Sequence, residues 1–279
     1  MATIYVPQGR AREYSPLALN LYNGCDHGCL YCYARGMAER FGRGDQWKTP
    51  VPRSGIVDQI KRDAPKFARS RGQVLLCFTG DPYCREETNS DITRAVLPIL
   101  LNNKIPVAIL TKGGKRCLRD LDIFRRFGRS IKVGATLTFA DTDKSREWEP
   151  GAALPEDRFA ALWQLHRAGI ATWASLEPII DPAETLEIIR ETTPYIDHYK
   201  LGRWNHDQRA DQNDYAGFLA KAIPLLRDLG KPLYVKECLR PYAPRARIRL
   251  TAEETDPDAL CLPPFPAVAR ADQLALSLS

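Results

Sequence analysis

The sequence predicts an α/β fold in which helices cover a mostly parallel β-sheet. Short apolar runs rich in β-branched residues recur along the chain, and each is followed by a segment with helical periodicity. Such alternation requires right-handed crossovers between parallel strands, as in open doubly wound sheets and in complete or partial barrels. The chain has 279 residues, 44% of them hydrophobic, which is sufficient for a packed core without disulfide bonds.

Strands and helices are expected to alternate along most of the chain. The expected strands cover residues 17–22, 74–79, 107–111, 131–138, 171–176 and 196–201, with 233–235 as a candidate seventh. Helices are expected near residues 33–41, 55–69, 90–102, 118–127, 156–168, 183–193 and 214–229. Residues 1–240 therefore form the predicted domain. Six prolines from Pro241 onward break regular structure, so residues 241–279 are expected to be an irregular extension that caps the barrel or extends freely.

Residues suited to chemistry follow the expected strands. In both candidate architectures the functional site lies at the carboxyl ends of parallel strands. The polar and cysteine-bearing positions at these ends are, in chain order, Cys25, Gly80 with Asp81, Lys112, Thr138, Glu177 and Arg203. We therefore expect them to border one site.

Charge and cysteine content restrict the class of protein. A net charge of +6 and a pI near 8.9 favour anionic partners such as nucleotides or nucleic acid, and are equally compatible with solubility alone. No apolar stretch is long enough for a signal peptide or a membrane span, so a soluble cytoplasmic protein that does not contact membranes is expected. In that compartment eight cysteines indicate metal binding, catalysis or core packing rather than disulfides.

Three cysteines form a compact motif on the loop after the first strand. It reads Cys25-Asp26-His27-Gly28-Cys29-Leu30-Tyr31-Cys32. A structural zinc ion requires four ligands, and the chain has no second CxxC pair, while His27 would have to fold back within its own tight loop. Three thiolates suit a [4Fe-4S] cluster that leaves one iron open to a small chelating molecule. We prefer the cluster and keep zinc as the alternative.

The motif resembles the signature of the radical S-adenosylmethionine (SAM) superfamily, CxxxCxxC with an aromatic residue before the last cysteine. In that family SAM chelates the open iron, and its reductive cleavage yields a 5′-deoxyadenosyl radical. The surroundings are similar to one branch, the spore photoproduct lyase-like proteins, also labelled DNA repair photolyases. The matching stretches are residues 20–25, 32–35, 79–83, 110–112, 119–122, 148–150, 158, 168–170 and 177–180. The resemblance implies a partial parallel (β/α)6 barrel, similar to an incomplete TIM barrel, with an irregular C-terminal extension.

The resemblance also implies how SAM is bound. Thr79, Gly80 and Asp81 would lie against its amine, where oxygen atoms accept hydrogen bonds. Lys112 would neutralise its carboxylate, and Tyr31 would pack near the cluster and the adenine. The structural alternatives are a turn or helix-cap residue for Asp81, a solvated charge for Lys112 and simple packing for the tyrosine.

Two more strand-end residues are candidate cofactor contacts. Thr138 follows the fourth expected strand and Glu177 the fifth. Glu177 could contact the SAM ribose or a substrate group, or instead form a salt bridge with an arginine such as Arg203.

Hydrogen-atom transfer has three candidate residues. Tyr33 stands where the lyases place a tyrosine implicated in relaying a hydrogen atom. The lyases also use a cysteine on the second strand as a donor to the substrate radical. Cys77 precedes Asp81 by one residue more than this pattern expects, which would turn it to the other face of the strand. Cys84, just past the strand, is the competing candidate.

The substrate is not fixed by these motifs. Basic stretches that could neutralise nucleic-acid phosphates comprise Lys112, Lys115, Arg116, Arg119, Arg125, Arg126, Arg129 and Lys132, then Arg240, Arg245, Arg247 and Arg249. An extruded base could stack on Trp148, Trp204 or Tyr242. The alternatives are a nucleotide or unrelated small metabolite, and a non-catalytic metal-binding module. For catalysis the resemblance implies a flavodoxin- or ferredoxin-like electron donor.

Overall fold

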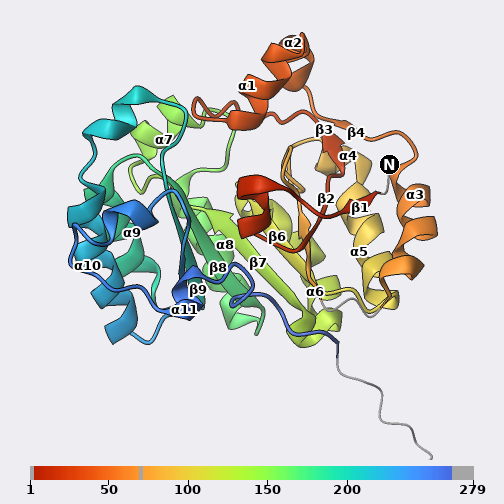
Figure 1. Ribbon diagram of the computed structural model, residues 1–279. Helices are drawn as coiled ribbons and strands as arrows, with labels where there is room; N and C mark the ends of the chain where they lie inside the picture. The colour runs from red at the N-terminus through yellow and green to blue at the C-terminus, as the bar shows by residue number, and fades with distance from the viewer. Residues whose placement is uncertain (1–2, 69–71, 266–279) are drawn as a thin grey trace, which may run out of the picture.

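The computed structural model describes residues 3–68 and 72–265, which fold around one eight-stranded sheet (Figure 1). Its strands are β1 (Ile4–Tyr5), β2 (Leu17–Leu19), β5 (Val74–Leu76), β6 (Val107–Thr111), β7 (Ile131–Thr136), β8 (Ala171–Ile179), β9 (His198–Arg203) and β10 (Leu233–Val235). They lie side by side in that order. β1 pairs antiparallel with β2, and every other pairing is parallel.

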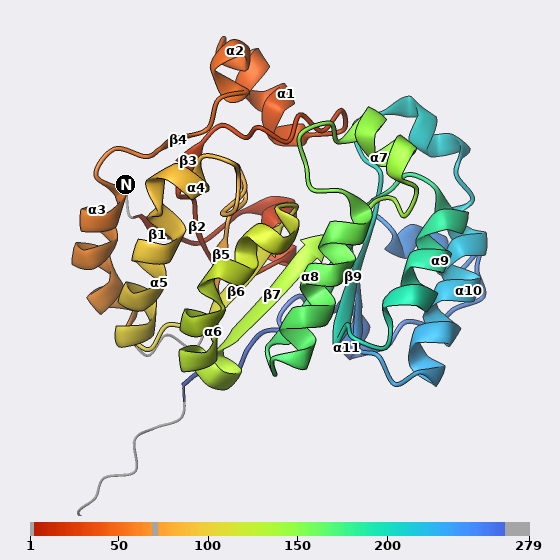
Figure 2. The ribbon, with the colours of Figure 1, turned by 180° about the vertical axis from the view of Figure 1, so that it is seen from behind.

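Helices connect the strands and cover the outer face of the sheet (Figure 2). They are α1 (Tyr33–Arg40), α2 (Gly44–Trp47), α3 (Ile56–Asp63), α4 (Glu87–Ser90), α5 (Ile92–Asn102), α6 (Leu121–Phe127), α7 (Thr142–Trp148), α8 (Pro155–Arg167), α9 (Pro182–Thr192), α10 (Tyr215–Asp228) and α11 (Ala252–Thr255). Short 3-10 helices are η1 (Gly9–Glu13), η2 (Ala64–Phe67), η3 (Gly114–Asp120), η4 (Gly128–Ser130), η5 (Gln208–Gln212) and η6 (Arg240–Tyr242).

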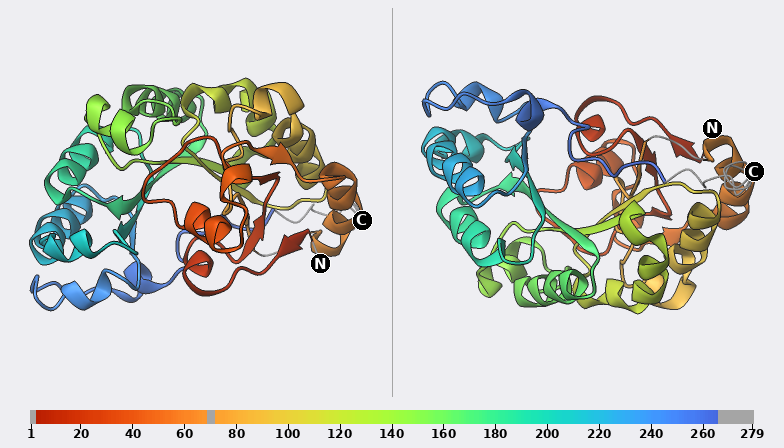
Figure 3. Two further views of the ribbon diagram at one scale, coloured as in Figure 1. Left: turned by 90° about the horizontal axis from the view of Figure 1, so that it is seen from above. Right: turned by 90° about the horizontal axis from the view of Figure 1, so that it is seen from below.

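The sheet curves into an open arc with the helices on its outer side (Figure 3). Its edge strands are β1 and β10, so the barrel does not close. Six strand-plus-helix units run from β2 to α10, and β10 adds a seventh parallel strand. The predicted partial (β/α)6 barrel is therefore confirmed.

The core has two layers. Outside the arc, apolar residues of the strands pack against the helices in two large clusters that include Ile109 with Leu97 and Leu201 with Leu219. Inside the arc, Trp173 fills the space between strands and donates an indole hydrogen bond to the Ile109 carbonyl at 3.0 Å. A Cβ at Gly134 would lie 2.5 Å from the Trp173 indole nitrogen, so only glycine leaves room for this ring.

Capping residues fix where several helices begin. Asp181 accepts hydrogen bonds from the backbone amides of Ala183 and Glu184 ahead of α9, and Pro182 occupies its first turn. Asp214 caps α10 in the same way, through the Gly217 amide. These signals explain why both helices begin within a residue of their predicted starts.

Some elements differ from the expectation. The sequence analysis missed α7, together with the small sheet of β3 (Tyr22–Asn23) and β4 (Val51–Pro52). β2 and β5 are also shorter than expected, because the chain leaves each strand early to build loops at the carboxyl edge. Seven-residue and two-residue elements carry too little periodicity to be recognised.

The C-terminal extension packs against the domain as far as it is described. It includes α11, which begins with a capping box formed by Thr251 and Glu254. Ile248 and Leu250 pack on the core, and the Leu262 amide bonds the Gln73 side chain at 2.9 Å. The segment thus covers the amino ends of the strands. Residues 266–279 of the predicted extension lie outside the described residues.

Within residues 3–68 and 72–265, no helix is both long enough and apolar enough to cross a membrane.

Candidate functional site

A cavity of about 530 Å³ lies at the carboxyl ends of the strands. Most of the predicted site residues line it: Cys25, Cys29, Tyr31, Cys32, Tyr33, Cys77, Thr79, Gly80, Asp81, Lys112 and Glu177. The cysteine loop, the N-terminal segment and the carboxyl ends of β5, β6, β7, β8, β9 and β10 therefore meet at one place. Its volume falls within the usual range of small-molecule sites, about 300–1,000 Å³.

The loop that carries the three cysteines is held on both sides by backbone hydrogen bonds. The Cys25 amide donates to the Trp47 carbonyl at 2.8 Å, and the Leu30 amide donates to the Trp148 carbonyl at 2.9 Å. Gly24 has φ +87°, and a Cβ there would lie 2.6 Å from the Trp47 carbonyl oxygen. Glycine at this position is therefore required for the close approach of the two segments.

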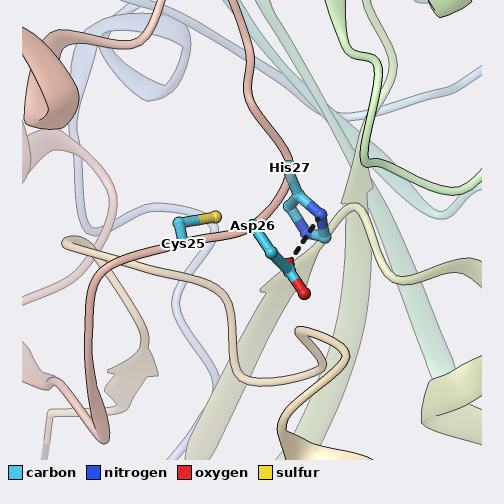
Figure 4. Close-up of side chains that lie close together, drawn as sticks. All are labelled: Cys25, Asp26 and His27. Atoms are coloured by element: carbon cyan, nitrogen blue, oxygen red, sulfur yellow. Dashed lines mark ion pairs between the residues drawn. The ribbon is translucent and has the colours of Figure 1, made fainter. Parts of the chain in front are cut away.

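His27 and Asp81 join the cysteine loop to the sheet. His27 Nε2 lies 2.9 Å from Asp81 Oδ2, and Nδ1 lies 3.5 Å from Asp26 Oδ1. Figure 4 shows Cys25, Asp26 and His27 close together. One potential ligand atom from each of the three lies within 4.8 Å of the others. Both ring nitrogens of His27 therefore face carboxylates, one on its own loop and one at the end of β5.

Asp81 is an anchor for the strand ends. Its carboxylate accepts hydrogen bonds from the Tyr83 amide at 2.7 Å, the Thr111 hydroxyl at 2.6 Å and the Lys112 amide at 2.7 Å. Burial alone would raise the pKa of Asp81, but His27, the Thr111 hydroxyl and the Lys112 amide lower it below its usual value. With its oxygens occupied in this way, Asp81 fits the structural alternative better than the expected contact with the SAM amine.

Thr79 and Gly80, the two residues before Asp81, also line the cavity. Gly80 has φ +137°, and a Cβ there would lie 2.9 Å from the Gly24 carbonyl oxygen. The amides of Phe78 and Thr79 both donate to the Asn20 side chain, at 2.8 and 2.9 Å. The Thr79 hydroxyl is buried and has no hydrogen-bond partner in the described part of the chain. Thr79 thus offers a free polar group to whatever fills the cavity.

Behind the cysteine loop lies a buried polar network. The Tyr31 hydroxyl donates to Glu149, which forms an ion pair with Arg158. Arg158 also donates to the Thr136 carbonyl at 3.0 Å. Burial alone would raise the pKa of Glu149, but Arg158 and Lys112 lower it, so the carboxylate stays ionised. Glu149 and Arg158 are site residues that were not predicted from the sequence, although both lie in the stretches that carry the resemblance.

Lys112 extends into the cavity from the end of β6. Its ammonium lies 5.4 Å from the centre of the Tyr31 ring, and it forms no ion pair with any described residue. Lys115, three residues later, instead pairs with Asp157 at 3.2 Å outside the cavity lining. Lys112 therefore keeps its charge available for an anionic group.

Glu177 forms the opposite wall of the cavity. Its carboxylate accepts hydrogen bonds from the Lys236 ammonium and the Tyr14 hydroxyl, both at 2.5 Å. Arg203, which was considered as the partner of Glu177, pairs instead with Asp211 at 2.8 Å. Tyr14 and Lys236 were not predicted from the sequence, because they belong to no motif and reach the site only through the curvature of the sheet.

Two of the three candidate hydrogen-atom donors line the cavity, and the third does not. Tyr33 is 46% exposed and donates to the Phe78 carbonyl at 3.1 Å, while Cys77 lines the cavity. Cys84 is fully buried and does not line it. Thr138 is also fully buried, 3.1 Å from the Tyr31 hydroxyl and outside the lining, which includes Thr136 instead. Cys84 and Thr138 are therefore not positioned to touch a molecule in the cavity.

Some members of the predicted basic stretches are engaged within the fold. Arg119 pairs with Glu87 and Asp91, and Lys132 is buried inside the arc. The aromatic candidates are packed as well: Trp148 and Trp204 contact each other edge to face, and Tyr242 packs on Tyr215. Arg119 therefore has partners within the fold, whereas Lys112 and Trp204 line the cavity.

A comparison with protein families matches residues 19–193 to the model of the radical SAM superfamily. The chain belongs to the radical SAM superfamily. An uncharacterized protein of Methanocaldococcus jannaschii is 32% identical over 182 residues, which cover 65% of this chain and 67% of that protein. An uncharacterized protein of Mycobacterium tuberculosis strain H37Rv is 27% identical over 180 residues, 63% of this chain and 52% of its own. The radical SAM chain thus aligns with only about half the length of the mycobacterial relative.

Solved structures share the fold of this radical SAM protein. Streptococcus suis SuiB bound to the precursor peptide SuiA has a TM-score of 0.61 at 14% identity, covering 85% of this chain and 54% of SuiB. A spore photoproduct lyase variant with a dinucleoside spore photoproduct has a TM-score of 0.55 at 17% identity. The match covers 71% of this chain and 59% of the lyase chain. At these identities the likeness establishes the fold alone.

Members of this superfamily are enzymes that use a [4Fe-4S] cluster and SAM. The cavity residues fit both groups. Cys25, Cys29 and Cys32 are free thiols on one loop, a donor set that leaves a fourth iron without a protein ligand. The unpartnered Thr79 hydroxyl and the unpaired Lys112 ammonium add polar groups for a small zwitterionic molecule.

Proposed function

We propose that this radical SAM enzyme binds its cluster through Cys25, Cys29 and Cys32 and acts by hydrogen abstraction on a nucleic-acid base or a nucleotide. The observation that carries the proposal is the meeting of three free thiols with Lys112 and the unpartnered Thr79 hydroxyl in one cavity. When bound, the reduced cluster supplies the electron that cleaves SAM to methionine and a 5′-deoxyadenosyl radical.

The chain's own residues bind and orient SAM in this proposal. Lys112 neutralises the carboxylate of SAM, and the Thr79 and Gly80 loop accepts hydrogen bonds from its amine. Tyr31 holds the loop beside the cluster through Glu149. Glu177, fixed by Lys236 and Tyr14, is available at the opposite wall to a ribose or substrate hydroxyl.

Two residues are candidates for hydrogen transfer. Tyr33 and Cys77 line the cavity, so either can return a hydrogen atom to a substrate radical. In this proposal Cys77 takes the role of the second-strand cysteine, despite its shifted position in the sequence.

The charge of the cavity supports an anionic substrate. Arg10 lines it and forms no ion pair with a described residue, so it can bind a phosphate. The fold likeness to spore photoproduct lyase is consistent with a base or nucleotide. An unrelated small metabolite is the alternative substrate, and a non-catalytic metal-binding module is the alternative without turnover.

Anaerobic reconstitution with iron and sulfide, followed by dithionite and SAM, tests the proposal. We expect 5′-deoxyadenosine, detected by mass spectrometry, and a change in its yield with single-stranded DNA or nucleotides. Cys25→Ala, Cys29→Ala and Cys32→Ala should each abolish it, while Cys117→Ala, outside the cavity lining, should not. No 5′-deoxyadenosine from protein with a full cluster would refute the enzyme, and an unchanged yield with DNA and nucleotides would favour the metabolite.

A further inference from the structure

We propose that the exposed apolar face of α1, formed by Tyr33, Met37 and Phe41, is the docking surface for an acidic electron-donor protein of the flavin or iron–sulfur class. The inference rests on the proposed function, because reductive cleavage of SAM consumes one electron. In that step the donor is oxidised by one electron and the cluster is reduced by one. Four features of the α1 face support this role.

Large exposed apolar side chains are concentrated near the cysteine loop. Among the described residues eight such side chains are exposed, and six belong to residues 6–51: Val6, Leu30, Tyr33, Met37, Phe41 and Val51. The members of the α1 face are spaced four residues apart, so they lie along one side of the helix and its C-cap. Phe41 is 70% exposed. Apolar patches of this kind mark interaction surfaces.

The α1 face begins at the metal-binding loop. Cys32 immediately precedes the first turn of α1, and Leu30, between two of the cysteines, is 56% exposed. The loop therefore reaches the surface at the amino end of this helix. Since electron transfer slows steeply with distance, a donor seated on the α1 face is well placed to reduce a cluster held by the loop.

The α1 face extends from the rim of the cavity to Phe41, which lies outside the cavity lining. α1 and α2 project beyond the carboxyl edge of the sheet (Figures 1 and 2). Tyr33 and Met37 border the cavity, whereas Leu30 and Phe41 do not line it. A substrate has to enter the cavity, but a donor needs only to approach the loop. The part of the face that lies outside the cavity therefore favours the donor.

Basic residues surround the α1 face and indicate the charge of the partner. Residues 33–48 contain Arg35, Arg40, Arg43 and Lys48 against Glu39 and Asp45. Arg35 is paired with Glu39 at 2.8 Å, and the Arg43 guanidinium lies 5.8 Å from the centre of the Phe41 ring. Arg40 and Lys48 form no ion pair in the described part of the chain. An apolar centre with a positive rim is complementary to a partner with an acidic rim, which speeds association.

Comparing two reductants distinguishes an effect on donor docking from an effect on SAM cleavage itself. Dithionite is small and needs no docking surface, whereas reduced flavodoxin is an acidic protein. We therefore compare 5′-deoxyadenosine formation with each reductant in Phe41→Glu and Arg40→Glu. Matched controls are Leu229→Glu and Arg126→Glu, exposed side chains at the carboxyl ends of α10 and α6 and hence at the opposite edge of the sheet.

We expect flavodoxin-driven rates to fall at least fivefold in the two α1 variants while their dithionite-driven rates stay within twofold of wild type. The controls should match wild type with both reductants, and added salt should slow only the flavodoxin reaction. Equal flavodoxin rates in all proteins, or an equal loss with both reductants, would overturn the proposal. Loss of oligonucleotide binding with unchanged flavodoxin rates would assign the face to nucleic acid and also overturn it.

Different results would contradict the docking surface and the proposed function. If dithionite yields no 5′-deoxyadenosine in wild type, the proposed function fails by itself. Titration of oxidised flavodoxin into wild type and Phe41→Glu then still tests docking, with at least fivefold weaker binding expected in the variant. Equal affinity would overturn the docking surface.

Discussion

Glu149 and Arg158 form an ion pair directly behind the cysteine loop, with only 2% and 1% of the two residues exposed. Glu149 also accepts a hydrogen bond from the hydroxyl of Tyr31, the residue immediately before Cys32. Arg158 is satisfied in turn by the Ala153 carbonyl at 2.7 Å. The loop that holds the three thiols is therefore supported by charges whose positions depend on each other.

Replacing Glu149 with Gln should destabilise the protein strongly. The guanidinium of Arg158 would remain buried without its carboxylate, and breaking one side of a buried pair costs about 3–5 kcal/mol. Urea unfolding measures the loss. Arg146→Gln, which removes an exposed pair with Asp143 on α7, is the control and should change stability by about 1 kcal/mol or less. Equal stability of the two variants would contradict a structural role for the buried pair.

Lys112→Met should weaken SAM binding while leaving the iron content unchanged. The variant loses a charge-assisted hydrogen bond worth about 1.5–3 kcal/mol, or roughly tenfold to hundredfold in affinity. Equilibrium dialysis of the reconstituted protein with SAM measures the change. Lys115→Met should bind SAM as wild type does, because Lys115 lies outside the cavity lining. Unchanged affinity in Lys112→Met would remove this lysine from the site.

Gly80→Ala should disturb the cavity wall. The backbone at φ +137° disfavours a side chain, and the new Cβ would lie 2.9 Å from the Gly24 carbonyl oxygen, so a cost of about 1–3 kcal/mol is expected. The midpoint temperature of thermal unfolding and the affinity for SAM should both decrease. Gly36→Ala in α1 meets nothing within 4 Å and should stabilise the helix slightly. Equal thermal stability and equal SAM affinity of the two alanine variants would show that a side chain at position 80 causes no strain.

Two lysines inside the arc should make stability depend on pH. Burial lowers the pKa of Lys200 to about 7 and of Lys132 to about 8, and the repulsion between them adds to the shift of Lys200. Between pH 8 and 10 the unfolded chain binds more protons at these lysines than the folded protein does. Their contribution to stability therefore increases with pH, by at most about 1.4 kcal/mol per pH unit for each lysine.

Lys200→Met should remove one of these contributions. Urea unfolding at pH 7.5, 8.5 and 9.5 should show a smaller gain with pH than in wild type. Lys221→Met, at an exposed position of α10, should retain the wild-type dependence. Parallel curves for wild type and Lys200→Met would show that Lys200 keeps its proton in the folded protein.

The sequence alone determined the order of the strands and the position of the cysteine loop. β6 and β10 have the predicted bounds, and β5, β7 and β8 begin at the predicted residues. Apolar β-branched runs and helical periodicity are local properties, so they can be recognised without knowing what they pack against. The cysteine spacing is local as well, because Cys25 and Cys32 lie on one loop.

The tertiary structure decided how the site is supported and which candidates reach it. The partners Glu177 and Lys236 are 59 residues apart in sequence, and Tyr31 and Glu149 are 118 apart. Whether Cys84 or Thr138 reaches the cavity depends on how the loops fold after their strands. Such pairs carry no spacing signal, because their contacts exist only once the parallel strands curve and bring their carboxyl ends together.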